Sequence, residues 1–197
     1  MGGGSISLYV AKLGVVIASV REGRVGLPVA QWFVAIARTH AAFEVDVIDL
    51  QVTNLPMLSE PHHPRLQRYQ QESTKRWSAT VTGFDAFVIV TPEYNHGAPP
   101  ALVNALDHLY AEWNYKPAGF VSYGGVSGGT RSVQTTKLLL AALKMVPIVE
   151  AVNIPFVGPL IDKESGAFKG GEPHAKAATL MLDELTRWTR ALQSLRS

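Results

Sequence analysis

The feature that most constrains this chain is a fivefold alternation of short apolar strand candidates with segments of helical spacing. Two of the strand candidates, 13–18 and 86–90, are continuous apolar runs, which is typical of strands buried on both faces of a parallel sheet. Helices between such strands return the chain to the same edge, so that the strands run parallel. The pattern predicts an α/β protein in three layers, with helices on both faces of an open five-stranded sheet.

The expected boundaries follow from the apolar runs and from the prolines and glycines between them. No shift in composition divides residues 12–197, so we expect one domain there, preceded by a flexible Gly/Ser-rich tail at residues 1–11. The expected strands are 12–19, 43–50, 84–91, 119–122 and 148–154, and the expected helices are 28–40, 65–82, 99–113, 132–145 and 173–195.

Composition excludes several classes of function. The chain has no cysteine, so disulfides, thiolate catalysis and Cys-ligated zinc are excluded, and any redox chemistry must use a bound cofactor. A net charge of +2 with scattered basic residues gives no case for a nucleic-acid partner. The N-terminus lacks a secretory pattern, and no apolar run approaches the ~18 residues of a membrane span. We therefore expect no membrane partner and a cytoplasmic location, since the lack of cysteine fits a reducing compartment.

Three unusual loops are predicted to meet at one edge of the sheet. In the flavodoxin-like strand order 2-1-3-4-5, ligands bind outside the carboxyl ends of the strands, at the switch point between strands one and three. The loops after strands one, three and four are residues 19–26, 92–100 and 123–131, the least ordinary segments of the sequence. Their convergence predicts a ligand site at that edge.

The first loop carries the groups expected of a phosphate site. Ser19, Arg21 and Arg24 precede a predicted helix, and Val25 and Gly26 lead into it. Free backbone amides and the helix dipole favour an anion there, and a hydroxyl and two guanidinium groups add charge-assisted hydrogen bonds. The loop is neither a Walker A loop nor a G-x-G-x-x-G motif. The alternative interpretation is an ordinary polar turn with solvated arginines.

The second loop offers an aromatic face and polar edges. It begins Pro92-Glu93-Tyr94-Asn95-His96 and ends in two prolines, which stiffen it. The tyrosine, asparagine and histidine side chains suit a planar heterocycle with polar edges. The alternatives stay open, with Tyr94 as a packing aromatic, Asn95 as a turn former and His96 as a structural residue. Glu93 could equally cap a helix or pair with an arginine.

The third loop is rich in glycine. Four of the six residues from Gly124 to Gly129 are glycines, which favours close approach of the backbone to a ligand over an ordinary turn into a helix.

His62 and His63 lie in a Pro-rich loop without a carboxylate cluster, and neither a zinc pattern nor a G-x-S-x-G elbow is present. We therefore expect no metal site.

With these loops, the chain resembles the NAD(P)H-dependent FMN reductase family, which includes chromate, quinone and azoreductase-like enzymes. The resemblance extends from about Lys12 to the last predicted helix. One departure is Ala18, where the family usually has glycine before the serine. The residues that carry the resemblance are Ser19-x-Arg21-x-x-Arg24, Pro92-Glu93-Tyr94-Asn95, Pro99, Leu102, Asn104-Ala105-Leu106-Asp107, Glu112-Trp113, Lys116-Pro117 and Ser122-Tyr123-Gly124-Gly125.

The resemblance implies a non-covalent FMN and NADPH or NADH as the electron donor. It implies ping-pong hydride transfer to small acceptors such as quinones, free flavin, azo compounds or metal oxyanions, with no protein residue as acid, base or nucleophile. Family members commonly form dimers or dimers of dimers, so a homodimer or homotetramer is expected. The implied cofactor-binding residues are Ser19, Arg21 and Arg24 at the phosphate with Val25 and Gly26 beside them, Pro92, Glu93, Tyr94 and Asn95 at the ring and ribityl chain with His96 beside them, and Ser122, Tyr123, Gly124 and Gly125 at the pyrimidine side.

Two other functions stay open. The first is a non-enzymatic FMN electron carrier of the flavodoxin kind, which ranks second because such carriers are often strongly acidic, whereas this chain has a net charge of +2. The second is a nucleotide-binding module without flavin on the same fold. For the oligomer, Tyr110 and Trp113 cannot both follow the apolar face of helix 99–113 without leaving some aromatic area outward. We therefore expect a symmetric dimer in which this helix meets its own copy. The alternative is that both rings tuck under the next loop.

Overall fold

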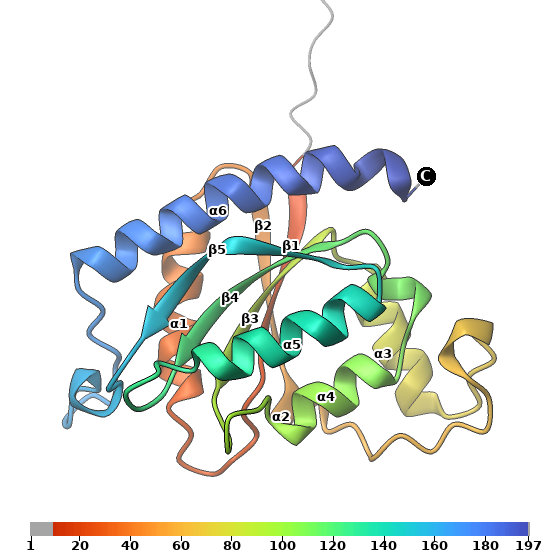
Figure 1. Cartoon of the computed structure of the whole chain (residues 1–197), viewed down its shortest axis with the longest axis horizontal. Coiled ribbons are helices and arrows are strands. Elements are labelled where there is room, and N and C mark those ends of the chain that lie inside the picture. Colours follow the sequence, from red (N-terminus) through yellow and green to blue (C-terminus); the bar gives the residue numbers. More distant parts are fainter. Residues whose placement is uncertain (1–9, 197) are drawn as a thin grey trace, which may run out of the picture.

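The computed structural model describes residues 10–196, which form a five-stranded parallel sheet of order β2-β1-β3-β4-β5 (Figure 1). This confirms the predicted fold class and strand order. The strands are β1 (Ala11–Ile17), β2 (Phe43–Asp49), β3 (Ala86–Pro92), β4 (Pro117–Tyr123) and β5 (Val146–Ile154). The α-helices are α1 (Gly26–Ala37), α2 (Leu50–Thr53), α3 (Glu72–Thr82), α4 (Pro100–Asp107), α5 (Thr130–Ala142) and α6 (Glu172–Leu192), and the 3-10 helices are η1 (Pro64–Leu66), η2 (Ala111–Trp113), η3 (Gly158–Leu160) and η4 (Gln193–Leu195).

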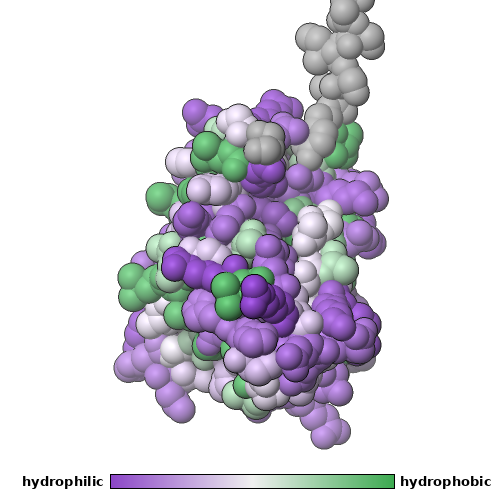
Figure 2. All heavy atoms as spheres, turned by 90° about the vertical axis from the view of Figure 1, so that its right-hand side faces the viewer, coloured by the Kyte–Doolittle hydropathy of each residue, from purple (hydrophilic) through white to green (hydrophobic). Residues whose placement is uncertain are grey.

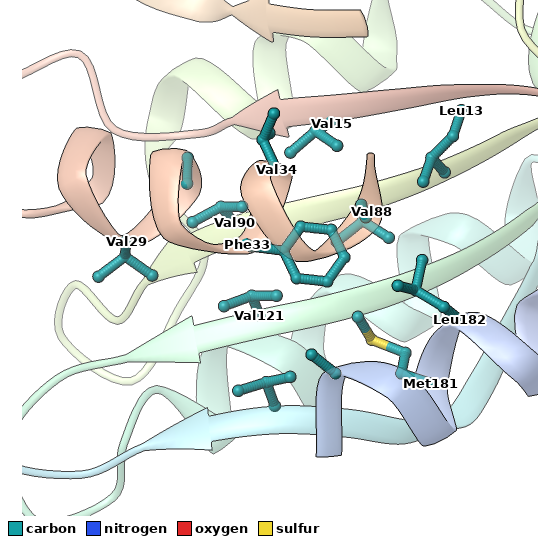
Figure 3. Close-up of a cluster of buried hydrophobic side chains, with 14 of the residues drawn as sticks. Leu13, Val15, Val29, Phe33, Val34, Val88, Val90, Val121, Met181 and Leu182 are labelled. Carbon is teal, nitrogen blue, oxygen red and sulfur yellow. The ribbon is translucent and has the colours of Figure 1, made fainter. Parts of the chain in front are cut away.

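Helices cover both faces of the sheet, which gives the molecule three layers (Figure 1). On one face, Phe33 of α1 and Met181 of α6 pack with strand residues such as Val88 (Figure 3). On the other face, α3, α4 and α5 pack on strand residues such as Phe87 and Phe120. Because neighbouring residues of β3 point into opposite clusters, the strand is buried along its whole length, as its continuous apolar run predicts.

Several boundaries differ from the prediction. Residues 65–82 were expected to be one helix, but α3 begins only at Glu72, after η1 and a segment without regular structure. At the N-terminus, β1 begins at Ala11, which is buried, so Ala11 belongs to the domain and not to the predicted tail. Residues 1–9 of that predicted tail lie outside the described residues.

The predicted helix 99–113 is interrupted, because two indole groups bind carbonyls at its end. The α4 helix ends at Asp107, and η2 follows as a separate turn. The indole nitrogen of Trp77 donates to the Ala105 carbonyl at 2.8 Å, and that of Trp113 donates to the Leu106 carbonyl at 3.2 Å. Both carbonyls lie near the end of α4, where a helix leaves carbonyls short of amide partners, and that of Leu106 also accepts the Leu109 amide at 3.4 Å.

Trp113 lies in the core and not at the surface. Its side chain is 2% exposed, and its ring centroid lies 5.0 Å from that of Phe87 and 5.9 Å from that of Trp77. Tyr110 is half-buried, with Arg65 4.6 Å above its ring and bonded to its hydroxyl at 2.9 Å. Of the two rings that were expected to leave some aromatic area outward, Trp113 leaves almost none and only Tyr110 is partly exposed.

Candidate cofactor-binding site

Three loops meet at the edge where the parallel strands end (lower left in Figure 1). Loop 1 (18–25) follows β1, loop 2 (93–99) follows β3, and loop 3 (124–129) follows β4. The Ser19 hydroxyl oxygen lies 2.9 Å from that of Tyr94, which joins loop 1 to loop 2. The predicted convergence of the loops is confirmed.

The Glu93 carboxylate joins loop 2 to loop 3. It accepts hydrogen bonds from the Ser127 hydroxyl at 2.9 Å, the Arg131 amide at 3.1 Å and the Arg131 Nε at 2.6 Å. Arg131 is the second residue of α5, so the carboxylate lies at a helix N-terminus, where negative charge is stabilised. Burial opposes its ionisation, but these bonds outweigh burial and lower the pKa of Glu93. The alternative interpretation of Glu93 as a cap and ion-pair partner is confirmed.

Loop 1 presents a set of free hydrogen-bond donors. Among the described residues, none accepts a hydrogen bond from the backbone amides of residues 19–23. The Ser19 side chain is buried beside these amides, whereas Arg21 is exposed, with its guanidinium 5.9 Å above the Tyr94 ring. Free amides ahead of a helix, together with a hydroxyl and a cation, are the groups that bind an anion. The residues present therefore fit a phosphate monoester.

Arg24 is engaged within the protein. Its guanidinium bonds both carboxylate oxygens of Asp49 at 2.5 Å, and its Nη1 also donates to the Ser19 carbonyl at 2.7 Å. The hydrogen bonds that Arg24 donates to Asp49 outweigh burial and raise the pKa of Arg24. The predicted direct contact of Arg24 with a phosphate stays a prediction, and the structure shows a second role for the residue as a tie between loop 1 and β2.

The start of α1 packs against the ring of Tyr123. This tyrosine is 5% exposed, and burial raises the pKa of its hydroxyl. A Cβ atom at Gly26 would lie 2.5 Å from the Tyr123 hydroxyl oxygen, so a larger residue there would displace the Tyr123 side chain. Val25 precedes the helix and packs partly buried on the core. These side chains shape loop 1 from the core side, and a contact of their backbone with the cofactor stays a prediction.

Loop 2 closes in a tight hairpin. Tyr94 and Gly97 exchange two backbone hydrogen bonds of 3.0 and 2.9 Å, and the residues between them, Asn95 and His96, have φ angles of 50° and 69°. Two successive left-handed residues are typical of a type I′ turn. The interpretation of Asn95 as a turn former is confirmed, and the turn leaves Asn95 and His96 exposed at the edge of the site.

Two of the glycines in loop 3 serve the loop itself. Gly128 and Gly129 have φ angles of +59° and +84°, and a Cβ atom at Gly128 would lie 2.2 Å from the Asn153 Oδ1. The Asn153 amide donates to the carbonyls of Ser127 and Gly128, both at 3.4 Å. Gly125 differs, because nothing lies within 4 Å of a Cβ built on it. The expectation of ligand approach therefore holds as a prediction for Gly125, and for Gly128 and Gly129 the structure gives a local reason instead.

The end of β4 is held in place by its neighbours. The buried Ser122 hydroxyl accepts a hydrogen bond from the Asn153 amide at 3.5 Å, and the Gly124 amide donates to a β5 carbonyl at 3.2 Å. Pro92 ends β3 in register with Tyr123. These residues line the same sheet edge, and their contact with a cofactor stays a prediction.

Sequence reasoning missed three residues that hold the loops, namely Asp49, Arg131 and Asn153. Asp49 is the last residue of β2, and Asn153 is the last but one of β5. Polar side chains at the carboxyl ends of parallel strands lie at the edge where ligands bind, and that position was the available signal. Arg131 carried no comparable signal, because its partner Glu93 is 38 residues away.

A pocket of about 220 Å³ opens beside loop 1, between α2 and α4, with Val20, Gln51 and Asn104 in its lining. Within residues 10–196, no three His, Asp or Glu side chains gather as a set of metal ligands. In the same part of the chain, no helix has the length and apolarity to cross a membrane.

The fold and these loops define a flavodoxin-like protein with a site for a phosphorylated, planar cofactor. Residues 11–158 match the family described as NADPH-dependent FMN reductase, and the chain belongs to that family. It is therefore an NAD(P)H-dependent oxidoreductase whose cofactor is FMN. The resemblance found in the sequence is confirmed.

Relatives span most of the chain. An NAD(P)H-dependent FMN reductase of Schizosaccharomyces pombe is 41% identical over 148 residues, which are 73% of this chain and 74% of the relative. One of Saccharomyces cerevisiae is 36% identical over 159 residues, 73% of this chain and 81% of the relative. The flavoenzyme NAD(P)H:(acceptor) oxidoreductase of Paracoccus denitrificans shares the fold, with a TM-score of 0.71 and 23% identity over 92% of this chain and 98% of that one.

Proposed function

We propose that this protein holds one FMN at the three loops, takes electrons from NADPH or NADH, and passes them to a small acceptor that uses the same site in turn. The observation that carries the proposal is the donor set of loop 1, where free amides, the Ser19 hydroxyl and the exposed Arg21 lie next to Tyr94. A phosphate bound there leaves loops 2 and 3 to flank the rest of the cofactor.

Each loop would contact a different part of the cofactor. Ser19 and Arg21 hold the phosphate with the loop 1 amides. The stiff hairpin of loop 2 offers Tyr94 and its exposed turn to the ring and ribityl chain. Loop 3 offers the open side of Gly125 to the polar edge of the ring, where no side chain blocks the approach of the backbone.

No protein acid or base is assigned to the reaction. Bound FMN supplies the redox chemistry, as the acceptor and then the donor of a hydride equivalent. Glu93 is ionised and bonded to Ser127 and Arg131, and Asp49 is bonded to Arg24, so neither carboxylate is free to move a proton. The residues of the site bind and orient the reactants and keep water from the ring face.

The proposed acceptors are quinones, free flavin, azo compounds or metal oxyanions. Support for the first and third comes from a quinone reductase of Pseudomonas putida, 28% identical over 142 residues, and an NADPH azoreductase of a Bacillus species, 30% identical over 103 residues. A cytoplasmic location is proposed as well, with the lack of cysteine as its support.

The absorbance spectrum of the purified protein, with and without NADPH under argon, tests the proposal. We expect flavin bands that NADPH bleaches and a quinone restores, and a heat-released chromophore that runs as FMN on reversed-phase chromatography. Bands that NADPH does not bleach would favour the electron carrier. FAD, or no flavin after reconstitution with FMN, would overturn the proposal.

A further inference from the structure

Arg24 is held inward by one carboxylate and one carbonyl. Its Nη1 donates to the Asp49 Oδ1 at 2.5 Å and to the Ser19 carbonyl at 2.7 Å, while its Nη2 donates to the Asp49 Oδ2 at 2.5 Å. The two side chains are only 7% and 14% exposed. A bidentate pair fixes the orientation of both groups as well as their separation. The guanidinium thus ties the end of β2 to the backbone of loop 1.

Asp49 is itself fixed on the sheet. It pairs in register with Ile17, the last residue of β1, two positions before Ser19. Its carboxylate accepts the Gln51 amide at 3.0 Å, as the cap of α2. Burial opposes ionisation, but the hydrogen bonds from Arg24 and Gln51 outweigh it and lower the pKa of Asp49. Asp49 is therefore a charged group with a set position.

We propose that Asp49 is a positioning residue for the cofactor phosphate: through Arg24 it holds the Ser19 carbonyl and keeps the loop 1 amides in the conformation that receives the phosphate. This inference rests on the proposed FMN site. Because Asp49 neutralises Arg24, Arg21 supplies the positive charge at the phosphate. The role differs from the direct phosphate contact that the sequence predicted for Arg24.

Asp85 offers a matched control at the opposite end of the sheet. Like Asp49, it pairs with an arginine, Arg196, at 3.3 Å, and it accepts a backbone amide, that of Lys12, at 2.8 Å. Its side chain is 22% exposed, against 14% for Asp49. Asp85 precedes β3 and so lies at the amino edge, away from the three loops.

Separate titrations of FMN and riboflavin into the flavin-free full chain, followed by fluorescence quenching, test the inference. Asp49→Asn should raise the Kd for FMN about 10- to 100-fold, the range that corresponds to hydrogen bonds with charged groups. The Kd for riboflavin, which lacks the phosphate, should change less than about twofold, as expected for a substitution that does not touch the ligand. Asp85→Asn should leave both Kd values unchanged. An unchanged FMN Kd, or equal losses for both ligands, in Asp49→Asn overturns the positioning role.

A double variant separates positioning from direct contact. If Arg24 and Asp49 act as one unit, Arg24→Gln with Asp49→Asn should bind FMN no more than about threefold more weakly than the worse single variant. Losses that multiply would assign Arg24 to the phosphate itself and overturn the inference. Arg24→Lys keeps the positive charge but cannot form the bidentate pair with Asp49, so it should also raise the Kd for FMN by at least about threefold. Full FMN affinity in Arg24→Lys contradicts the proposal.

The failures of the two proposals are distinguishable. A wild-type chain that binds neither flavin defeats the proposed function. A wild-type chain that binds FMN, with Asp49→Asn equal to it, defeats only the positioning role. If Asp49→Asn does not fold, Asp49→Glu is compared with Arg24→Lys instead, because Asp49→Glu keeps the carboxylate. The inference then requires that Asp49→Glu binds FMN more tightly than Arg24→Lys, and the reverse order overturns it.

Discussion

Arg21 and Arg24 are three positions apart in one loop, yet they meet different surroundings. Arg21 is exposed beside the Tyr94 ring, and Arg24 is bonded to Asp49 and to the backbone of loop 1. An exposed cation with no ion-pair partner among the described residues keeps its charge available to a ligand. A paired one serves mainly to fix geometry.

We predict that Arg21→Ala weakens the binding of FMN by about 1.5–3 kcal/mol, the range for a hydrogen bond to a charged group. Riboflavin affinity should hardly change, because riboflavin has no phosphate for Arg21 to bind. Isothermal titration calorimetry with both ligands checks this. Arg68→Ala, which removes an exposed arginine outside the three loops, is the control and should bind both flavins as the wild type does.

Lys116, a residue of the family motif, caps a helix and lies outside the three loops. Its amine donates to the Val81 carbonyl at 2.8 Å, in the last turn of α3, and the residue is 7% exposed. Cations stabilise helix C-termini. Burial lowers the pKa of Lys116 to about 8.

This pKa predicts how stability changes with pH. The ordinary pKa of lysine is 10.5, so between pH 8 and 10.5 the unfolded chain holds the proton that the folded chain has released. The free energy of unfolding should therefore rise with pH in that window, by up to about 3 kcal/mol from this residue. Urea unfolding of wild type and Lys116→Met at several pH values measures the difference. A difference that does not change between pH 8 and 10.5 contradicts the lowered pKa.

At the scale of elements, loop 3 shows two kinds of glycine. Gly128 has a left-handed backbone and meets the Asn153 side chain, whereas Gly125 faces open space. Both belong to the same short turn between β4 and α5. The first stabilises the conformation of the loop, and the second is open to a ligand.

We predict that Gly128→Ala lowers the free energy of unfolding by about 1–3 kcal/mol, because of its positive φ and its contact with Asn153. Gly125→Ala should leave the stability of the flavin-free protein nearly unchanged and weaken FMN binding, since a methyl group then lies on the open side of the turn. Thermal unfolding with and without FMN distinguishes the two. Equal effects of both substitutions on the stability of the flavin-free protein would contradict the predicted difference between Gly128 and Gly125.

At the scale of the whole molecule, the burial of Trp113 leaves only the half-buried Tyr110 as aromatic support for the dimer interface. The side of the molecule that carries η1 and the end of α6 is mostly hydrophilic, with scattered apolar residues (Figure 2). Exposed apolar side chains next to α4 remain, because Val52 of α2 is 81% exposed and Met57 of the following segment is 75% exposed. Asn104 of α4 holds that segment through the Leu58 amide at 2.9 Å.

We predict a homodimer or a dimer of dimers that uses this segment and α4. Val52→Glu with Met57→Glu should shift the chain toward monomer, because two charges then replace apolar area. Multi-angle light scattering of the FMN-loaded protein measures the mass. Val149→Glu on the edge strand β5, where the valine is 84% exposed, is the control and should keep the wild-type mass. A monomeric wild type at micromolar concentration refutes the prediction.

The sequence alone predicted the α/β class, the strand order and the edge at which the loops meet. Continuous apolar runs such as that of β3 report burial on both faces, and they do so from residues next to one another in the chain. The carboxyl ends of parallel strands share one edge, so the convergence of loops 1 and 2, seen in the contact of Ser19 with Tyr94, followed from topology. The family was recognisable partly for the same reason, because several of its motif residues lie in these loops.

Only the tertiary structure decided what the polar side chains of the site contact. Arg24 and Asp49 are 25 residues apart, and Glu93 and Arg131 are 38 residues apart. Such pairs depend on the register of strands and the placement of helices, which local periodicity does not report. The end of α4 is a similar case, since the N–H groups of Trp77 and Trp113 reach its carbonyls from other elements. Residue types and their order predicted the edge at which the loops meet, whereas contacts between distant residues determine which side chains there are free to bind a ligand.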